Sequence, residues 1–411
     1  MEAVWRIESA RLIAGLARVV RDVGLAEDLA QDALVAALVQ WPESGVPENP
    51  GAWLMAVARR RGVDTIRRAV TLERKVELLG RELSEAEDPM DEIEFDTHVT
   101  DDVLRLMFTA CHPVLAVEAR VALTLKLVAG LSTEEIARAF LVQTTAMAAR
   151  ITRAKKALAD AQVPFEVPVG DELATRLGSV LEAVYLVFNE GYTATTGERW
   201  ARAELCEEAM RLGRMLAALA PEEAEASALV ALMELQASRL RARTGPDGGI
   251  VTLLDQNRAR WDRLLITHGL AALQHAERVG GGGSYLLQAQ IAACHARAGR
   301  AADTDWVRIA DLYGSLVELT RSPIVELNRA VAVSMADGPA AALPIVDALA
   351  ALPALRGYHL LPSVRGDLLA KLGRHDEARV EFERAAGMTA NERERAYLLA
   401  RAAEVAAIQR P

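Results

Sequence analysis

Cysteine is rare in this chain of 411 residues, and long apolar runs are missing from it. The three cysteines, Cys111, Cys206 and Cys294, lie far apart, which excludes a disulfide scaffold and a Cys-x-x-Cys metal motif. No run reaches the ~18 apolar residues of a membrane helix, and the N-terminal MEAVWRIESAR lacks the basic start and apolar run of a signal peptide. We therefore expect a cytoplasmic protein with no membrane partner.

Strand-like patterns and an excess of positive charge are also missing. Alternating β-branched runs are absent, whereas apolar residues recur at spacings of three and four from end to end, so the sequence predicts an all-α fold. The 47 basic and 57 acidic residues give a net charge of -10, which argues against nonspecific nucleic-acid binding by the chain as a whole. Any contact with DNA must come from local basic patches.

Basic residues gather in two clusters that an acidic segment separates. Seven basic residues lie between Arg59 and Lys75, and a second cluster begins at Arg150. From Glu77 to Asp102, eleven acids accompany a single base. Few large apolar residues occur there, so this segment is predicted to be a solvated linker between two basic modules.

The first module is predicted to hold a helix with one apolar and one polar face. In GLAEDLAQDALVAALVQW, small and apolar residues follow helical spacing along one side. The predicted buried face consists of Ala26, Leu29, Ala30, Ala33, Leu34, Ala37 and Leu38, and the outer face consists of Glu27, Asp28, Gln31 and Asp32. A second helix, AWLMAVARRRGVDTIRR, begins at Pro50 and Gly51. Its arginines serve either for solubility or as contacts along a phosphate backbone, with Trp53 as an apolar anchor.

The second module has the pattern of a helix-turn-helix. Ser132 and Glu135 form a capping box that starts a short helix ending near Phe140, and the next helix is predicted from Gln143 or Thr144. The second helix should turn Met147, Ile151, Ala154 and Leu158 to the core, and Thr145, Ala149, Thr152, Arg153 and Lys156 outward. Small polar residues with basic neighbours suit entry into a DNA major groove; a generic helical hairpin is the alternative.

Together the two modules resemble the extracytoplasmic-function sigma factors of bacterial RNA polymerase. AEDLAQDALVAAL resembles the region 2 helix that grips the polymerase clamp, and AWLMAVARRRGVDTIRR resembles the helix that melts and reads the minus-ten element. GLSTEEIARAF with AMAARITRAKKAL resembles the region 4 helix-turn-helix that reads the minus-35 element. Arg60 stands where the family commonly has Asn.

The resemblance implies site residues, partners and domains. Polymerase contacts would come from Glu27, Asp28, Gln31 and Asp32, and DNA contacts from Trp53, Arg59, Arg60, Asp64, Arg67, Arg68, Thr145, Ala149, Arg150, Thr152, Arg153 and Lys156. The partners would be promoter DNA and core polymerase, through its β′ clamp and β flap. The predicted domains are region 2 at 1–76, an acidic linker at 77–102, region 4 at 103–162 and a linker at 163–170. The acidic linker is either a spacer or a polyanion that imitates nascent RNA.

The remaining residues, 171–411, are predicted to form a tetratricopeptide-like α-solenoid. SVRGDLLAKLGRHDEARVEFERAAG resembles one such repeat, with looser copies upstream. In this repeat Gly366 would allow two helices to approach closely, while Ala378, Phe382 and Ala385 pack between them.

Candidate chemistry in this extension is sparse. His268 and His275, and Cys294 beside His295, have no third ligand at a suitable spacing, so no metal site is predicted. FNEGY, which begins at Phe188, and the glycine run at 280–283 suit either a ligand loop or simple connections. No cofactor and no catalytic residue are predicted.

The sequence leaves three functions open. We favour a sigma factor whose extension modulates its activity or contacts polymerase, with no separate anti-sigma protein. The alternative is a helix-turn-helix regulator whose repeat domain binds a peptide or small ligand. This alternative leaves unexplained the helix that carries Asp28 and Asp32 and the helix that carries the arginines. An enzyme with its active site in the extension has no supporting set of residues.

Overall fold

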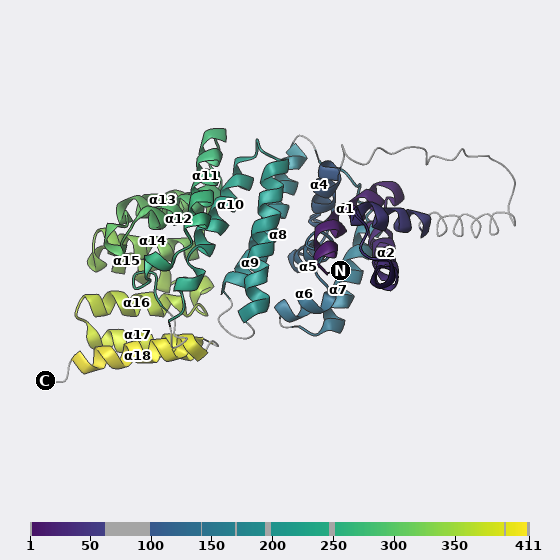
Figure 1. Cartoon of the computed structure of the whole chain (residues 1–411). Coiled ribbons are helices and arrows are strands. Elements are labelled where there is room, and N and C mark those ends of the chain that lie inside the picture. Colours follow the sequence, from purple (N-terminus) through teal and green to yellow (C-terminus); the bar gives the residue numbers. More distant parts are fainter. Residues whose placement is uncertain are drawn as a thin grey trace. The chain divides into compact units, whose positions relative to one another are not determined.

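The chain is helical wherever the structure describes it (Figure 1). The computed structural model describes residues 2–61, 99–140, 142–168, 171–193, 199–245, 251–389 and 392–408. Within these ranges every regular element is an α-helix or a short 3-10 helix, and none is a strand. The all-α fold predicted from the apolar spacing is confirmed.

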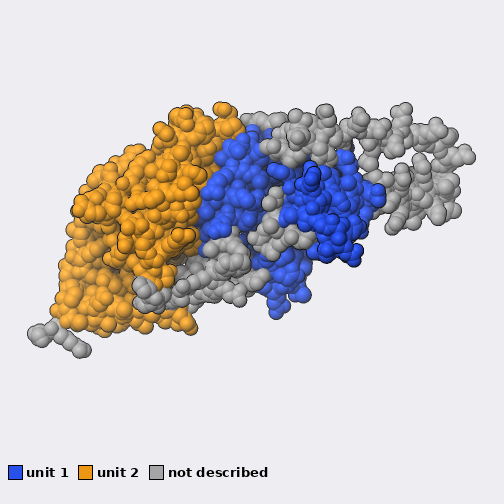
Figure 2. Space-filling view, viewed as in Figure 1, with its two compact units in different colours: residues 1–191, 201–219 blue, residues 192–200, 220–411 orange. Residues whose placement is uncertain are grey.

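The helices form two compact units, coloured blue and orange in Figure 2. Unit 1 comprises residues 1–191 and 201–219, and unit 2 comprises residues 192–200 and 220–411. The helices of unit 1 are α1 (Glu2–Val20), α2 (Val23–Ser44), a helix over residues 50–61, α4 (Val99–Ala110), α5 (Val117–Leu127), α6 (Thr133–Ala139), α7 (Thr144–Asp160), α8 (Asp171–Thr193) and α9 (Arg199–Leu219). Large apolar side chains from several of these helices form its core: Ile13, Leu54, Met107, Phe108 and Leu123.

Helices α8 and α9 belong with the helices before the predicted linker at 163–170. Arg176 of α8 donates to the carbonyl oxygen of Phe108 at 3.1 Å, and Arg211 of α9 donates to that of Val128 at 3.3 Å. Because these bonds tie α8 and α9 to unit 1, the start of unit 2 does not coincide with residue 171, where the sequence places the start of the extension.

Two capping contacts shape the first part of unit 1. The Asp22 carboxylate accepts from the backbone N–H of Leu25 at 2.9 Å and starts α2, and the Asn49 side chain accepts from Ala52 at 3.0 Å and starts the helix over residues 50–61. The indoles of Trp41 and Trp53 then join these two helices edge to face, with ring centroids 5.2 Å apart. The start predicted at Pro50 is confirmed.

Unit 2 is a succession of helices, most of which pack on their neighbours along the chain. Helix α10 is buried around almost its whole circumference, because most of its residues are apolar or small. The elements of unit 2 are α10 (Ala224–Ala237), η1 (Leu240–Ala242), η2 (Arg258–Arg260), α11 (Arg263–Val279), α12 (Ser284–Arg297), η3 (Ala301–Asp303), α13 (Trp306–Thr320), α14 (Pro323–Ala336), α15 (Pro339–Ala350), η4 (Pro353–Leu355), α16 (Leu360–Lys371), α17 (His375–Met388) and α18 (Glu392–Ile408).

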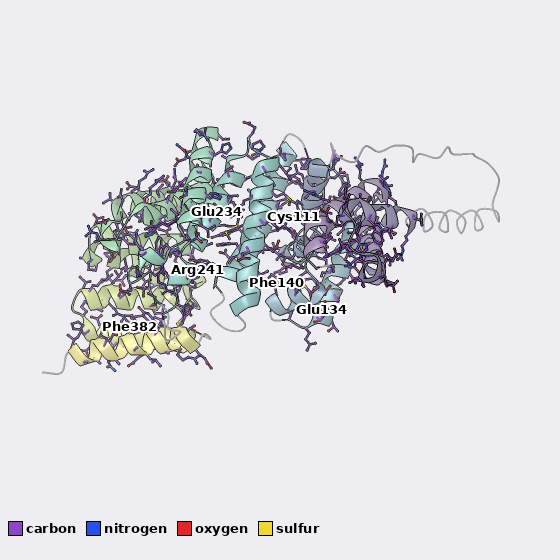
Figure 3. All side chains as sticks on the ribbon, in the orientation of Figure 1. Cys111, Glu134, Phe140, Glu234, Arg241 and Phe382 are labelled. Atoms are coloured by element: carbon purple, nitrogen blue, oxygen red, sulfur yellow. The ribbon has the colours of Figure 1, made fainter. Side chains whose placement is uncertain are left out.

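Gly366 lies at a close approach between α16 and α17, as the sequence predicts. A Cβ atom at Gly366 would lie 3.0 Å from the ring of Phe382, which Figure 3 labels, and 3.3 Å from the carbonyl oxygen of Ala378. Ala378, Phe382 and Ala385 are all buried. The local packing is therefore confirmed, while the assignment to tetratricopeptide repeats stays a prediction.

Candidate polymerase and promoter surfaces

A capping box starts the helix-turn-helix. The backbone N–H of Ser132 donates to the Glu135 carboxylate at 2.7 Å, and the N–H of Glu135 donates to the Ser132 hydroxyl at 3.1 Å. Helix α6 follows and ends at Ala139, and α7 begins at Thr144, so both predicted helices are confirmed. Leu141, which was predicted to lie in the turn, is outside the described residues.

Helix α7 separates its apolar and polar residues as the spacing predicts. The buried residues are Met147, Ile151, Ala154 and Leu158. The exposed residues include Thr145, Ala149, Thr152, Arg153 and Lys156, and Arg150 is half-buried. Arg153 donates to the carbonyl oxygen of Ala149 one turn back at 3.2 Å, and Lys156 pairs with Asp160 at 3.0 Å. Both contacts are exposed and lie within the same helix, so the two cations remain accessible to a polyanion.

Helix α2 presents a mixed acidic and apolar line of side chains to solvent. Asp28, Asp32, Val35 and Val39, here called the α2 stripe, follow one another at helical spacing, and Val35 and Val39 are 55% and 68% exposed. The sequence prediction missed Val35 and Val39, although helical spacing places them on the same face as Asp28 and Asp32 and opposite the buried alanines. Leu38 was predicted to be buried and is half-exposed.

Glu27 was predicted to lie on the outer face of α2, but the structure buries it. Its side chain is only 3% exposed, and it forms ion pairs with Lys155 of α7 and with Lys126 of α5, the latter at 3.5 Å. Gln31 donates to the same carboxylate. Helical spacing places Glu27 beside the acidic face, but two lysines from distant segments cover it. A buried carboxylate needs such cations, because an unpaired charge would be strongly destabilising.

The arginines of the helix over residues 50–61 differ in how far they are exposed to solvent. Arg60 is exposed, whereas Arg61 pairs with Asp32 at 3.5 Å and donates to the Asp32 carbonyl oxygen at 3.1 Å. Arg59 is half-buried, and burial together with the nearby Arg18 lowers the pKa of its guanidinium. Trp53 is half-buried. The other predicted contacts of this module, Asp64, Arg67 and Arg68, lie outside the described residues.

The end of the predicted acidic linker is structured and partly buried. Most of 77–102 lies outside the described residues, but α4 begins at Val99 and so includes its last positions. Asp102 is 4% exposed and pairs with Arg105 at 2.5 Å and with Arg18 of α1 at 3.4 Å. Asp102 therefore belongs to the core of unit 1 rather than to a solvated linker, because two arginines balance its charge.

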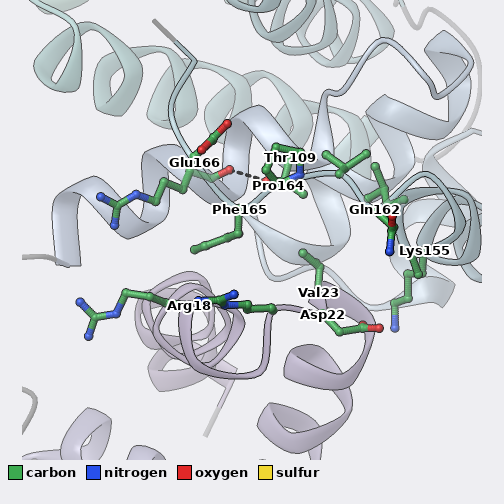
Figure 4. A pocket seen from close by; sticks show the side chains of 14 residues that line it. Arg18, Asp22, Val23, Thr109, Lys155, Gln162, Pro164, Phe165 and Glu166 are labelled. Atoms are coloured by element: carbon green, nitrogen blue, oxygen red, sulfur yellow. Dashed lines mark hydrogen bonds between the residues drawn. The ribbon is translucent and has the colours of Figure 1, made fainter. Parts of the chain in front are cut away.

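Residues 162–166, which follow α7, line a cavity of about 860 Å³ in unit 1 (Figure 4). The turn between α1 and α2, the middle of α4 and the end of α7 form its other walls, and Phe165 lines it from the linker side. Its basic residues outnumber its acidic ones: Arg18, Arg21, Arg105 and Lys155 against Asp22 and Glu166. The first residues of the predicted linker at 163–170 therefore border the cavity between the predicted regions 2 and 4.

Candidate ligand groups elsewhere are accounted for by local structure. His275 contacts the carbonyl oxygen of Pro221 at 3.0 Å, and no group of three or more metal-binding side chains occurs among the described residues. Burial raises the pKa of the Cys111 thiol to about 11, which makes it unreactive. The glycine run at 280–283 is a connection, since the Glu225 carboxylate fills the space beside Gly283 and accepts from the first turn of α12. Phe188 of FNEGY is fully buried.

None of the described helices is both long enough and apolar enough to span a bilayer.

Three family profiles match successive parts of the chain: Sigma-70 region 2 at residues 7–71, Sigma-70, region 4 at residues 105–158, and a family of unknown function (DUF6596) at residues 176–277. An uncharacterized protein of Rhizobium meliloti (strain 1021) is 46% identical over 388 residues, which cover 93% of this chain and 90% of that protein.

A helix-turn-helix beside a second helical module, each matched by its own sigma region, defines a transcription initiation factor. The chain belongs to the sigma-70 family, as a factor that pairs regions 2 and 4 and carries an additional C-terminal domain. It is an RNA polymerase sigma factor, and its partners are core polymerase and promoter DNA. Members of this family are initiation factors rather than enzymes.

Proposed function

We propose that the α2 stripe docks on the clamp of the β′ subunit. Val35 and Val39 are well exposed on a helix whose opposite face is buried, and Asp28 and Asp32 extend the same line. Apolar side chains that stay in water beside charged ones are typical of a binding surface. This exposed stripe is the observation that carries the proposal.

Promoter recognition is divided between two helices in this proposal. The exposed face of α7 enters the major groove of the minus-35 element, with Thr145 and Ala149 at base edges and Arg153 and Lys156 at phosphates. The helix over residues 50–61 brings Trp53, Arg59 and Arg60 to the minus-ten element, and Asp64, Arg67 and Arg68 follow it in the sequence. Region 4 also contacts the β flap.

The free chain must open for both elements to be bound at once. Elements named minus ten and minus 35 lie about 25 base pairs, or ~85 Å, apart along B-DNA. In the structure Lys155 of α7 is ion-paired with Glu27 of α2, so the two modules are in contact. The chain between residues 61 and 99 could reach more than ~100 Å at ~3.3 Å per residue. We infer that binding to core polymerase separates the Glu27 carboxylate from Lys155.

In this proposal the protein acts in the cytoplasm. Its C-terminal extension modulates the activity of the sigma regions in the same chain. A tethered domain has an effective concentration in the ~mM range, so even a weak contact is occupied much of the time. We propose that the extension supplies a needed contact with polymerase, in place of control by a separate anti-sigma protein. The alternative function, a helix-turn-helix regulator that does not bind polymerase, does not explain why residues 7–71 match sigma region 2.

Charge reversal in the α2 stripe tests the polymerase contact. Asp28→Lys/Asp32→Lys should weaken binding of core polymerase at least about 10-fold, which corresponds to ~1.4 kcal/mol. Both aspartates are exposed, and their ion pairs with Lys155 and Arg61 span 3.6 Å and 3.5 Å, so folding should change by only about 1 kcal/mol. Glu222→Lys/Glu318→Lys, exposed positions of unit 2, makes the same change in net charge as a control. Equal affinity of both variants would refute the proposal.

A further inference from the structure

A second cavity, of about 320 Å³, lies inside unit 2 and is not used by the sigma surfaces. It is formed where the end of α10 meets α12, α13 and α14. Its size lies at the lower end of the range of small-molecule sites, which is ~300–1,000 Å³. A folded peptide segment is too large for it, so the cavity suits a small molecule.

The walls of this cavity combine apolar surface with basic and amide groups. Leu235, Ile291, Leu316 and the indole of Trp261 supply apolar surface, and Arg239 and His295 supply charge or hydrogen bonding. No aspartate or glutamate is among the residues that line it. A mainly apolar pocket with a few polar groups and one sign of charge is suited to an organic ion of the opposite sign.

Two buried nitrogen atoms at the cavity have no hydrogen-bond partner among the described residues. Trp261 is 4% exposed, and its indole N–H is unpaired. The Nδ1 atom of His295 is likewise buried and unpaired. Buried donors in folded proteins nearly always have an acceptor, because leaving one unmet is unfavourable. An acceptor-rich ligand in this cavity would supply one.

Arginine side chains make the surroundings of the cavity positive. Arg258 stacks over the Trp261 ring, 4.9 Å from its centroid, and donates to the carbonyl oxygens of His295 and Ala298. Burial, Arg239 and Arg258 together lower the pKa of His295 to about 4, so His295 is neutral at pH 7. Arg239 forms no ion pair with any described carboxylate. Asp303 lies near Arg258, which does not line the cavity, whereas Arg239 lines it and no acidic residue lies beside it in the wall.

We propose that this cavity binds a small organic anion, a carboxylate or a phosphate monoester with an apolar body, whose charged group pairs with Arg239. The apolar body would lie against Trp261, Leu235 and Ile291. This site gives the extension a chemical input, and it stands independently of the sigma surfaces because ligand binding is measured without polymerase or DNA.

The test measures ligand binding to the full chain by calorimetry and thermal unfolding. Phenylacetate and phenyl phosphate probe the two anion types, and phenylacetamide is the neutral match of the first. We expect at least one anion to bind and to raise the melting temperature, and the amide to bind at least about 10-fold more weakly, since a hydrogen bond to a charged group contributes ~1.5–3 kcal/mol. The anion that binds more tightly identifies the charged group.

Three variants locate the binding. Arg239→Gln should weaken the anion at least about 10-fold, and Ala292→Phe, which fills the cavity, should abolish binding. Arg241→Gln removes an exposed arginine that does not line the cavity and should bind as the unaltered chain does. Melting temperatures without ligand show whether each variant is folded. Failure of both anions to bind, or equal binding of an anion by folded Arg239→Gln and by the unaltered chain, would overturn the proposal.

Discussion

Lys155 of α7 is ion-paired with Glu27 of α2, a residue 128 positions earlier in the chain. Lys126 of α5 lies 3.5 Å from the same carboxylate, and the Glu27 side chain is 3% exposed. This cluster joins the segment matched by sigma region 2 to the segment matched by region 4. It is therefore both a packing contact and, in our proposal, the contact that polymerase must break.

The first prediction concerns the strength of this contact. Lys155→Gln alone should lower the free energy of unfolding by about 3 kcal/mol, because it removes one cation from a buried carboxylate. Glu27→Gln/Lys155→Gln should cost less than the sum of the two single changes, with a coupling energy of about 1–3 kcal/mol. Urea unfolding of the four proteins measures this coupling. Single effects that add within about 0.5 kcal/mol would show that the pair contributes nothing.

The second prediction concerns phosphate contacts by α7. Arg153→Gln/Lys156→Gln should weaken binding to different promoters equally and should flatten the slope of log affinity against log salt by about 0.9 for each phosphate that the helix no longer neutralises. Titrations of a promoter duplex with the sigma factor bound to core polymerase, at several salt concentrations, give this slope. An unchanged slope would contradict the proposed docking of α7.

Thr145 provides the control for the preceding experiment. Because its exposed side chain is placed at base edges, Thr145→Ala should leave the salt slope unchanged and alter which minus-35 sequence is preferred. Selection from a randomised minus-35 element measures that preference. The two variants thus separate contacts that position the helix from contacts that read the sequence.

The third prediction concerns removal of unit 2. A chain that ends at Leu219 keeps α8 and α9, whose Arg176 and Arg211 bind backbone carbonyls of unit 1, so it should remain folded. We expect it to bind core polymerase and to transcribe less than the full chain. A chain that ends at residue 168 should be less stable, because it lacks both helices. Undiminished transcription by a folded chain ending at Leu219 would show that the part of the extension in unit 2 is not a needed contact.

The fourth prediction concerns the close approach at Gly366. Gly366→Val should destabilise unit 2 by about 1–3 kcal/mol, because the new side chain meets the Phe382 ring at 3.0 Å. Gly387→Ala, in a helical position with open space around it, should be neutral or stabilising by up to about 1 kcal/mol. Thermal unfolding compares the two. Equal stability of both variants would contradict the tight packing of α16 on α17.

Features that depend on local spacing could be predicted from the sequence. The Ser132 and Glu135 capping box and the buried face of α7 follow from neighbours within four residues, and both are confirmed. Glu27 and Leu38 could not be predicted in this way. They lie on the same flank of α2, about three helical turns apart, but distant lysines cover the flank at Glu27, whereas Leu38 stays half-exposed.

The extension shows the same limit of local patterns. The close approach at Gly366 was predictable because a repeat-like segment specifies its own packing. The placement of α8 and α9 with unit 1 depends on Arg176 and Arg211, which bond to carbonyl oxygens many residues away. The cavity at Trp261 likewise joins five separate segments, none of which carries a motif by itself.

Promoter-directed transcription in a purified system tests the central claim most directly. Core polymerase should be incubated with genomic DNA, with and without this chain, and the 5′ ends of the transcripts should be sequenced. We predict discrete start sites that appear only with the chain and that share two upstream elements at a fixed spacing, and these starts should disappear with Asp28→Lys/Asp32→Lys. The same set of starts with and without the unaltered chain would contradict its action as a sigma factor.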